Sequence, residues 1–166
     1  MSTFYYVNVT IHVLAAMLWL GGMFFFGIVG APALRAIEPP PLRQKLFREL
    51  GTRFRRVGWA AIGVLVVTGV INLQYRGWLH WHDVLGSPTF WRTGVGHALA
   101  AKLTAVVLML AISAIHDFVH GPRAGRAAPG SPDAVTWRKR AALLARINAL
   151  VGVLLVAAAV RLARGG

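Results

Sequence analysis

Four long stretches of this sequence lack charge almost completely, and they constrain the fold more than any other feature. Residues 1–34 contain no Asp, Glu, Lys or Arg, and a second uncharged block runs from Val57 to Tyr75. Two further blocks, 93–116 and 141–160, are interrupted only by Lys102 and Arg146. Each block has the ~20 residues that a helix needs to cross ~30 Å of hydrocarbon, or more. The sequence therefore predicts an all-α integral membrane protein, built as an antiparallel bundle of four transmembrane helices.

The boundaries of the helices follow from where charged and helix-breaking residues return. We predict a single membrane domain over residues 1–166, with helices at about residues 4–30, 56–75, 93–118 and 134–163. A run of three prolines after the first helix precedes an amphipathic stretch at about residues 42–54, where apolar side chains recur at helical spacing among Arg and Lys. We expect this cytoplasmic segment to lie on the membrane surface.

Composition excludes several classes of protein. Hydrophobic residues make up 57% of the chain and charged residues 14%, which rules out a water-soluble domain. The chain has no cysteine, so a disulfide framework and a thiolate metal site are excluded as well. Any metal would have to be held by His, Met, Lys or carboxylate groups. The four methionines form no cluster in the sequence, which weakens the case for a Cu(I) pathway of thioethers.

The basic residues indicate how the chain is oriented in the membrane. Lys and Arg number 18 against 5 Asp and Glu. The two loops that follow the first and third helices contain most of those outside the spans: Arg35, Arg43, Lys45, Arg48, Arg53, Arg55 and Arg56 in one, and Arg123, Arg126, Arg138, Lys139 and Arg140 in the other. The positive-inside rule places both loops in the cytoplasm and both termini outside a bacterial-type inner membrane. The basic surplus thus predicts contact with anionic lipid, and no nucleic-acid binding is needed to explain it.

Two histidines in the hydrocarbon region are candidate ligands of a metal. An ionisable group inside a bilayer costs ~2.5–3.5 kcal/mol on insertion scales, so it indicates a function. His12 and His97 lie on antiparallel helices in the outer half of the membrane, an arrangement that suits the two axial ligands of a haem b in a four-helix bundle. Packing offers an alternative for each: His12 could hydrogen-bond a Ser or Thr of a neighbouring helix, and His97 could face the headgroups.

Two basic side chains within the spans are further candidates for a cofactor or ligand site. Lys102 lies between His97 and the middle of the bilayer, where it could contact a carboxylate of a substrate or cofactor, or act catalytically in proton transfer. The alternative is that it extends to the outer headgroups. Arg146 is expected to form an ion pair with Asp117 near the end of the third helix, or else to clamp a ligand carboxylate.

Two other pairs of histidines have spacings that occur in metal sites. His116 and His120 are four residues apart, and His80 and His82 are two apart. Neither pair comes with an assured third ligand, so a specific metal site is the less favoured interpretation of both.

Short motifs along nearly the whole chain resemble a known superfamily. These are His12 with Trp19 and Gly21-Gly22, Arg55-Arg56, Thr68-Gly69, Lys102-Leu103, His116-Asp117 and Arg146-Ile147-Asn148. The set resembles the superfamily that contains the copper-resistance protein D (CopD) domain and the haem-containing four-helix protoporphyrinogen oxidase (HemJ). The resemblance to the oxidase branch implies a haem b, with functional positions at His12 and Lys102. The resemblance to the copper branch implies copper uptake.

Three functions remain open from the sequence. The first is a haem b-binding membrane protein with a redox or electron-transfer role, which could be an oxidoreductase and would need a quinone, a porphyrin or a redox protein as its partner. The second is a copper-transport or copper-resistance protein that uses His12, His97, His80 and His82. The third is a structural or assembly subunit without a cofactor. An absorption spectrum and a copper determination on the purified protein distinguish the three.

Overall fold

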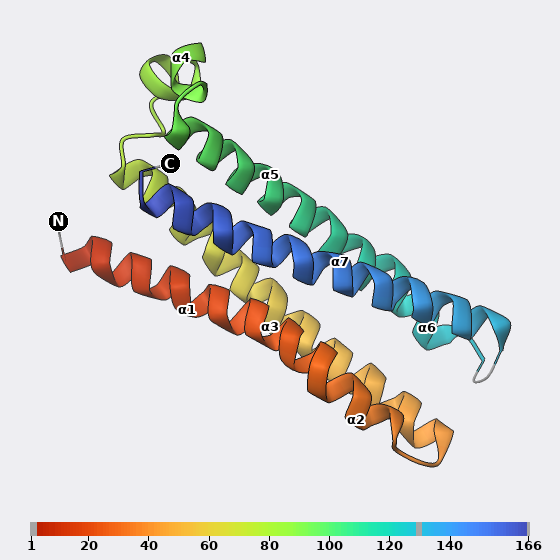
Figure 1. Cartoon of the computed structure of the whole chain (residues 1–166). Coiled ribbons are helices and arrows are strands. Elements are labelled where there is room, and N and C mark those ends of the chain that lie inside the picture. Colours follow the sequence, from red (N-terminus) through yellow and green to blue (C-terminus); the bar gives the residue numbers. More distant parts are fainter. Residues whose placement is uncertain (1–2, 129–130, 166) are drawn as a thin grey trace.

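The protein is a bundle of four long helical spans, as the uncharged blocks predict. The computed structural model describes residues 3–128 and 131–165. Four helical segments are long and apolar enough to cross a membrane, namely Thr3–Arg35, Pro40–Tyr75, Gly94–Arg126 and Pro132–Ala163. They run side by side and alternate in direction, so that both termini lie at one end of the bundle (Figure 1). The predicted fold class, an all-α protein with four membrane spans, is confirmed.

Each span is one or more helices joined without a sharp break. The first span consists of α1 (Thr3–Phe25), a π-helical turn (Phe26–Gly30) and α2 (Ala31–Arg35). The second is α3 (Pro40–Tyr75) and the fourth is α7 (Pro132–Ala163). The third span consists of α5 (Gly94–Ile115), a π-helical turn (His116–His120) and α6 (Gly121–Arg126). The short helix α4 (Pro88–Trp91) precedes it. We call the end with both termini and α4 the terminal end, and the opposite end, with α2 and α6, the basic end (Figure 1).

The amphipathic stretch at residues 42–54 is helical, but it is continuous with the second span. Pro39 is the extended N-cap of α3, and Pro40 and Pro41 occupy its first turn, where proline is tolerated because those N–H groups have no partner within the helix. The apolar face of this segment packs against the first span, since the ring of Phe26 lies 6.4 Å from that of Phe47 and 6.3 Å from that of Phe54. The segment therefore lengthens the bundle at its basic end.

The spans associate as two pairs, α1 with α3 and α5 with α7. Contacts between α1 and α7 connect the pairs. Trp19 of α1, only 6% exposed, lies at this junction with Ala61, Ile62 and Met109. Its ring lies against two glycines, one in each pair: a Cβ at Gly58 or at Gly152 would be 3.7 Å from it. The large indole thus packs directly on both helix pairs, against α3 on one side and α7 on the other.

Candidate functional site

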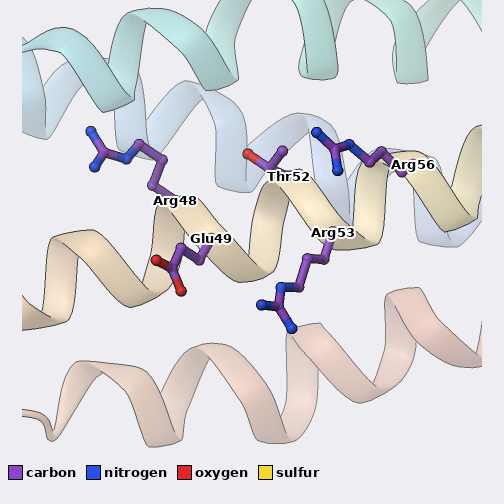
Figure 2. A pocket seen from close by; sticks show the side chains of 5 residues that line it. All are labelled: Arg48, Glu49, Thr52, Arg53 and Arg56. Carbon is purple, nitrogen blue, oxygen red and sulfur yellow. The ribbon is translucent and has the colours of Figure 1, made fainter.

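A groove on α3 at the basic end gathers three exposed arginines (Figure 2). Its lining consists of Arg48, Glu49, Thr52, Arg53 and Arg56. Arg48, Thr52 and Arg56 point to one side of the helix, and Glu49 and Arg53 to the other. The groove is open, so it encloses no small molecule. Guanidinium groups at the end of a membrane span suit contact with phosphates of anionic lipids, as the charge distribution predicts.

The polar side chains inside the bundle lie in three groups along its length. On α1, Asn8, His12, Trp19 and Met23 share one face, because spacings of four, seven and four residues return to the same side of a helix. Asn8 and Met23 are about 22 Å apart along the axis, at a rise of 1.5 Å per residue. The terminal group surrounds His12 and the central group surrounds Met23. The basic-end group lies on α3 and on the π-helical turn that follows α5. The interior therefore offers polar atoms at several depths.

In the terminal group, the hydrogen bonds of Thr68 assign the tautomer of His12. The Thr68 hydroxyl donates its only hydrogen to the carbonyl oxygen of Val64, at 2.6 Å. Its oxygen must then accept from Nδ1 of His12, which lies 2.7 Å away. With the hydrogen on Nδ1, the Nε2 atom of His12 carries the free lone pair. A neutral imidazole held in this way by a second residue is the form that binds metal ions.

Two further features hold His12 against α3. Asn8 donates to the carbonyl oxygen of Thr68 at 3.1 Å and to Oδ1 of Asn72 at 2.9 Å, which ties the same faces of the two helices together. Gly69 lies beside the ring as well, since a Cβ there would be in ordinary van der Waals contact with Cε1 of His12, at 3.5 Å. The hydrogen bond to a neighbouring threonine, weighed as one role of His12, is thus confirmed.

The structure brings Lys102, and not His97, toward His12. Lys102 is partly buried and lies within electrostatic reach of His12 and of Arg76. His97 precedes it by five residues, which turn an α-helix by about 140° and place the two side chains on different faces of α5. His97 is exposed and lines a groove between α5 and α7 with Ala101, Ala158 and Arg161. Among the described residues, no contact joins the two imidazoles that were predicted to hold a haem.

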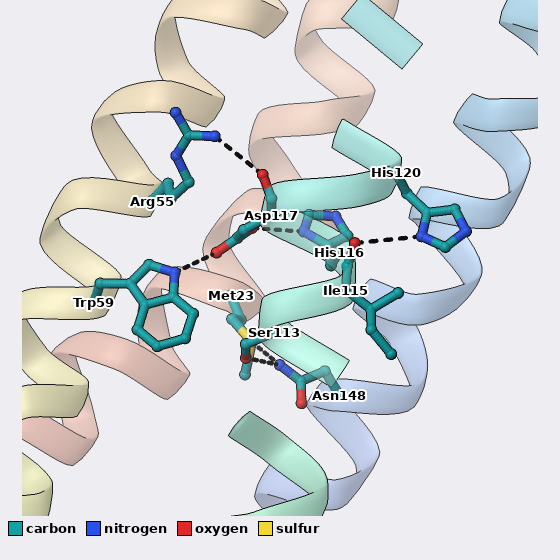
Figure 3. Close-up of polar contacts among 9 residues, drawn as sticks. All are labelled: Met23, Arg55, Trp59, Ser113, Ile115, His116, Asp117, His120 and Asn148. Atoms are coloured by element: carbon teal, nitrogen blue, oxygen red, sulfur yellow. Dashed lines mark hydrogen bonds and ion pairs between the residues drawn. The ribbon is translucent and has the colours of Figure 1, made fainter. Parts of the chain in front are cut away.

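The central group joins three helices through one amide. Nδ2 of Asn148, on α7, donates to Oγ of Ser113 on α5 at 2.9 Å and to Sδ of Met23 on α1 at 3.7 Å (Figure 3). Asn148 is 5% exposed and Ser113 is 6% exposed. Within the part of the chain that the structure describes, Oδ1 of Asn148 has no hydrogen-bond partner. Sequence reasoning missed this group. An asparagine and a serine inside uncharged blocks were the available signal.

The basic-end group surrounds Asp117. Its carboxylate accepts from Nε1 of Trp59 at 2.9 Å and from Nδ1 of His116 at 2.8 Å, while Arg55 donates to its backbone carbonyl at 3.0 Å (Figure 3). The predicted ion pair between Asp117 and Arg146 is wrong, because Arg146 is exposed and takes no part in a salt bridge among the described residues. The π-helical turn that begins at His116 is the reason. Its wider turn departs from the 3.6-residue spacing and directs Asp117 toward α3.

The remaining histidine pairs lack a third ligand in the described part of the chain. Nδ1 of His116 is hydrogen-bonded to the carboxylate of Asp117, and Nδ1 of His120 lies 3.3 Å from the carbonyl oxygen of Ile115. His80 and His82 are exposed, and the side chain of Asp83 beside them lies outside the described residues. No three of the described His, Asp and Glu side chains are grouped closely enough to hold a metal ion.

Comparison with known proteins gives one family and one relative. The pattern of the family described as copper resistance protein D (CopD) matches residues 48–162. An uncharacterized protein of Aquifex aeolicus (strain VF5) is 30% identical over 156 residues, which make up 93% of this chain and 92% of that protein. No solved structure matches the chain.

Proposed function

Since the chain belongs to the copper resistance protein D family, we propose that it carries copper ions across the membrane, with His12 as their first ligand inside the bundle. The observation that carries the proposal is the pair of hydrogen bonds at Thr68, which leaves Nε2 of His12 free to bind a metal ion. Imidazole is a suitable ligand for copper, and fixing its other nitrogen strengthens such a site. Copper is here the cargo of the protein.

The surroundings of His12 suit transport better than storage. Lys102 brings a positive charge within electrostatic reach of His12, and a like charge lowers the affinity of a site for a cation. A site of moderate affinity releases its ion, as conduction requires. Polar groups also lie at two further depths, around Asn148 and around Asp117, with the indole of Trp19 packed between His12 and the first of them. Polar and ionisable residues within membrane spans commonly mark ion pathways.

The direction of transport follows from the orientation of the chain. We place the basic end in the cytoplasm of a bacterial-type cell and the terminal end outside the inner membrane, because the basic loops lie at the former. Copper would then meet His12 from outside, and the protein would serve uptake.

Labelling of introduced cysteines tests this orientation. The chain has no cysteine of its own, so each introduced thiol reports alone. In intact cells, cysteines at Gly86 and Gly165 should react with a membrane-impermeant maleimide, and a cysteine at Ala127 should react only after the cells are opened. The reverse pattern would invert the direction of transport.

Haem b binding, with a redox or oxidoreductase role, is the alternative that the sequence raised. Thr68 and Gly69 position His12 as one potential axial ligand, but the structure supplies no second histidine opposite it, since His97 lines the groove between α5 and α7. The residues present therefore do not fit the two-histidine arrangement. Lys102 would be the group near a haem propionate or a transferred proton. A Soret band in the purified protein would favour this alternative, and absence of both haem and copper would favour a structural subunit.

A copper-uptake assay with two histidine variants tests the proposal. In proteoliposomes, His12→Ala is expected to reduce copper uptake to the level of empty vesicles, because the free Nε2 atom is lost. His97→Ala is the matched control, since it removes an exposed imidazole that lies on a different face of α5 from Lys102. This variant should retain more than half of the wild-type rate. Wild-type uptake in the His12 variant, with protein amount and helicity matched, would refute the assigned role of His12.

A further inference from the structure

The groove between α5 and α7 at the terminal end combines a cationic rim with an apolar floor. His97 lies in the first turn of α5, and Arg161 lies in the last turn of α7. The rest of the lining consists of alanines, namely Ala98, Ala101, Ala157 and Ala158. The groove is open on one side, and its volume of about 410 Å³ falls in the ~300–1,000 Å³ range of sites that hold small ligands. A ligand in it would meet charge at one end and apolar side chains at the other.

The order of these residues along the helices follows the profile of a lipid leaflet. The uncharged block of the fourth span ends at Val160, so Arg161 lies where the hydrocarbon ends. Ala101 and Ala157 are each one helical turn, about 6 Å, deeper than His97 and Arg161. Aromatic side chains typical of the membrane interface pack beside Ala98 at the same end, namely Trp78, Phe90 and Trp91. The groove thus places its cations at headgroup level and its alanines at the level of acyl chains.

Arg161 lacks a counter-charge in the described part of the chain. Its guanidinium takes part in no salt bridge there. The acidic side chains that the structure describes lie toward the basic end, and they are Glu38, Glu49, Asp117 and Asp133. Arg76 at the terminal end differs, since it donates to the carbonyl oxygen of Leu162 at 3.5 Å and lies 4.9 Å from the ring of Trp78. The charge of Arg161 therefore favours an anion in the groove.

A second copy of the chain suits this groove less well. Small residues do allow helices to approach closely in a membrane. Two copies in the same orientation are related by a two-fold axis along the membrane normal, which brings residues of equal depth together. The Arg161 side chains of the two copies would then lie at the same depth of one interface, where like charges repel strongly at low dielectric. An anionic occupant avoids this repulsion.

We propose that the groove binds an anionic phospholipid from the leaflet at the terminal end, with its phosphate at His97 and Arg161 and an acyl chain along the alanines. A guanidinium binds phosphate oxygens through two parallel hydrogen bonds. The imidazole of His97 contributes an N–H donor in either neutral tautomer. This contact with the headgroups is the packing role that the sequence raised for His97. The inference is independent of copper transport, since it concerns the lipid-facing surface of the second helix pair.

Counting the lipid that stays bound through purification tests this site. The wild type and its variants are reconstituted in an equal mixture of phosphatidylglycerol and phosphatidylcholine, extracted in mild detergent and analysed by native mass spectrometry. Anionic lipid held at the basic end is common to all of them, so the differences report the groove. We expect Arg161→Gln and Ala101→Leu to retain about one phosphatidylglycerol fewer per chain, because one removes the charge and the other fills the floor.

Two matched variants are the controls. Arg164→Gln removes an exposed charge at the C-cap of the same helix, outside the groove. Ala60→Leu adds the same side chain as Ala101→Leu, at an exposed position of α3. Both controls should retain as much phosphatidylglycerol as the wild type.

Several outcomes would overturn the site. Wild-type retention of phosphatidylglycerol in Arg161→Gln, or an equal loss in Arg164→Gln, excludes a specific contact with Arg161. Equal losses of both lipids in Arg161→Gln would show that the charge of the headgroup is not recognised. A wild-type dimer that Ala101→Leu dissociates would assign the groove to a second copy. Arg161→Gln decides the proposal even where Ala101→Leu folds poorly, because Arg161 is exposed.

Discussion

Gly96→Ala is expected to unfold the terminal end of the protein and to lower its stability by about 3 kcal/mol, at the upper end of typical overpacking costs. A Cβ at position 96 would overlap the carbonyl oxygen of Phe90 and the Cα atom of Trp91. Both are backbone atoms of α4, so neither can move aside by a change of rotamer. Thr93 fixes the turn from α4 into α5, since its hydroxyl donates to the carbonyl of Phe90 at 2.7 Å and accepts from the amide of Gly96 at 3.0 Å.

Thermal unfolding in detergent, followed by circular dichroism, measures this effect. Gly63→Ala is the matched control, because Gly63 lies within α3 and a Cβ there would have nothing within 4 Å. We expect the control to unfold at or slightly above the wild-type temperature, since alanine favours helix over glycine. Equal unfolding temperatures for Gly96→Ala and the control would contradict the close approach of α4 to α5.

Trp19→Ala is expected to destabilise the protein by a similar amount, about 3 kcal/mol, as Trp→Ala substitutions in protein cores do. The indole lies between Gly58 and Gly152, and it connects the two helix pairs at the place where α1 meets α7. Lipid is as apolar as the protein interior, so little is gained by transfer of the ring out of lipid. The cost comes instead from the cavity and from lost contacts, as in large-to-small substitutions of protein cores.

Leu18→Ala is the control for this prediction, because Leu18 is its neighbour on α1 and is 55% exposed on the outer face. Unfolding in detergent should leave Leu18→Ala close to the wild type and shift Trp19→Ala strongly. A comparable shift in both variants would show that the junction between the pairs does not depend on the indole.

The fold class was predictable because the bilayer leaves few alternatives to a chain with four uncharged blocks. Backbone groups in hydrocarbon must be satisfied within their own segment, so length and apolarity are enough to define each helix. The pairing of the spans was not predictable, since their outward faces and their buried faces are equally apolar. The joining of residues 42–54 to the second span depended on contacts of Phe47 and Phe54 with Phe26, which lies in another helix.

The candidate site was predictable in its residue types and less so in its partners. His12 and Lys102 were singled out because ionisable groups are rare in membrane spans, and the structure brings them into electrostatic reach. Depth along the helices suggested His97 as the partner of His12, but depth does not determine which face a residue occupies. The assumed pairing of Asp117 with Arg146 failed for a local reason, because a π-helical turn has no reliable signature in one sequence.

The association of the spans in two pairs has a consequence for how this protein is made. Each pair joins spans that follow one another along the chain, so each is a helical hairpin with contacts between sequence neighbours. Closing such a hairpin costs little conformational entropy, because the connecting loop is short, and it needs no residue from the other hairpin. The first hairpin can therefore complete its hydrogen bonds from Asn8 and His12 to α3 while the ribosome is still translating α5. The second hairpin then has only to dock on the first, and α7 meets α1 at the indole of Trp19.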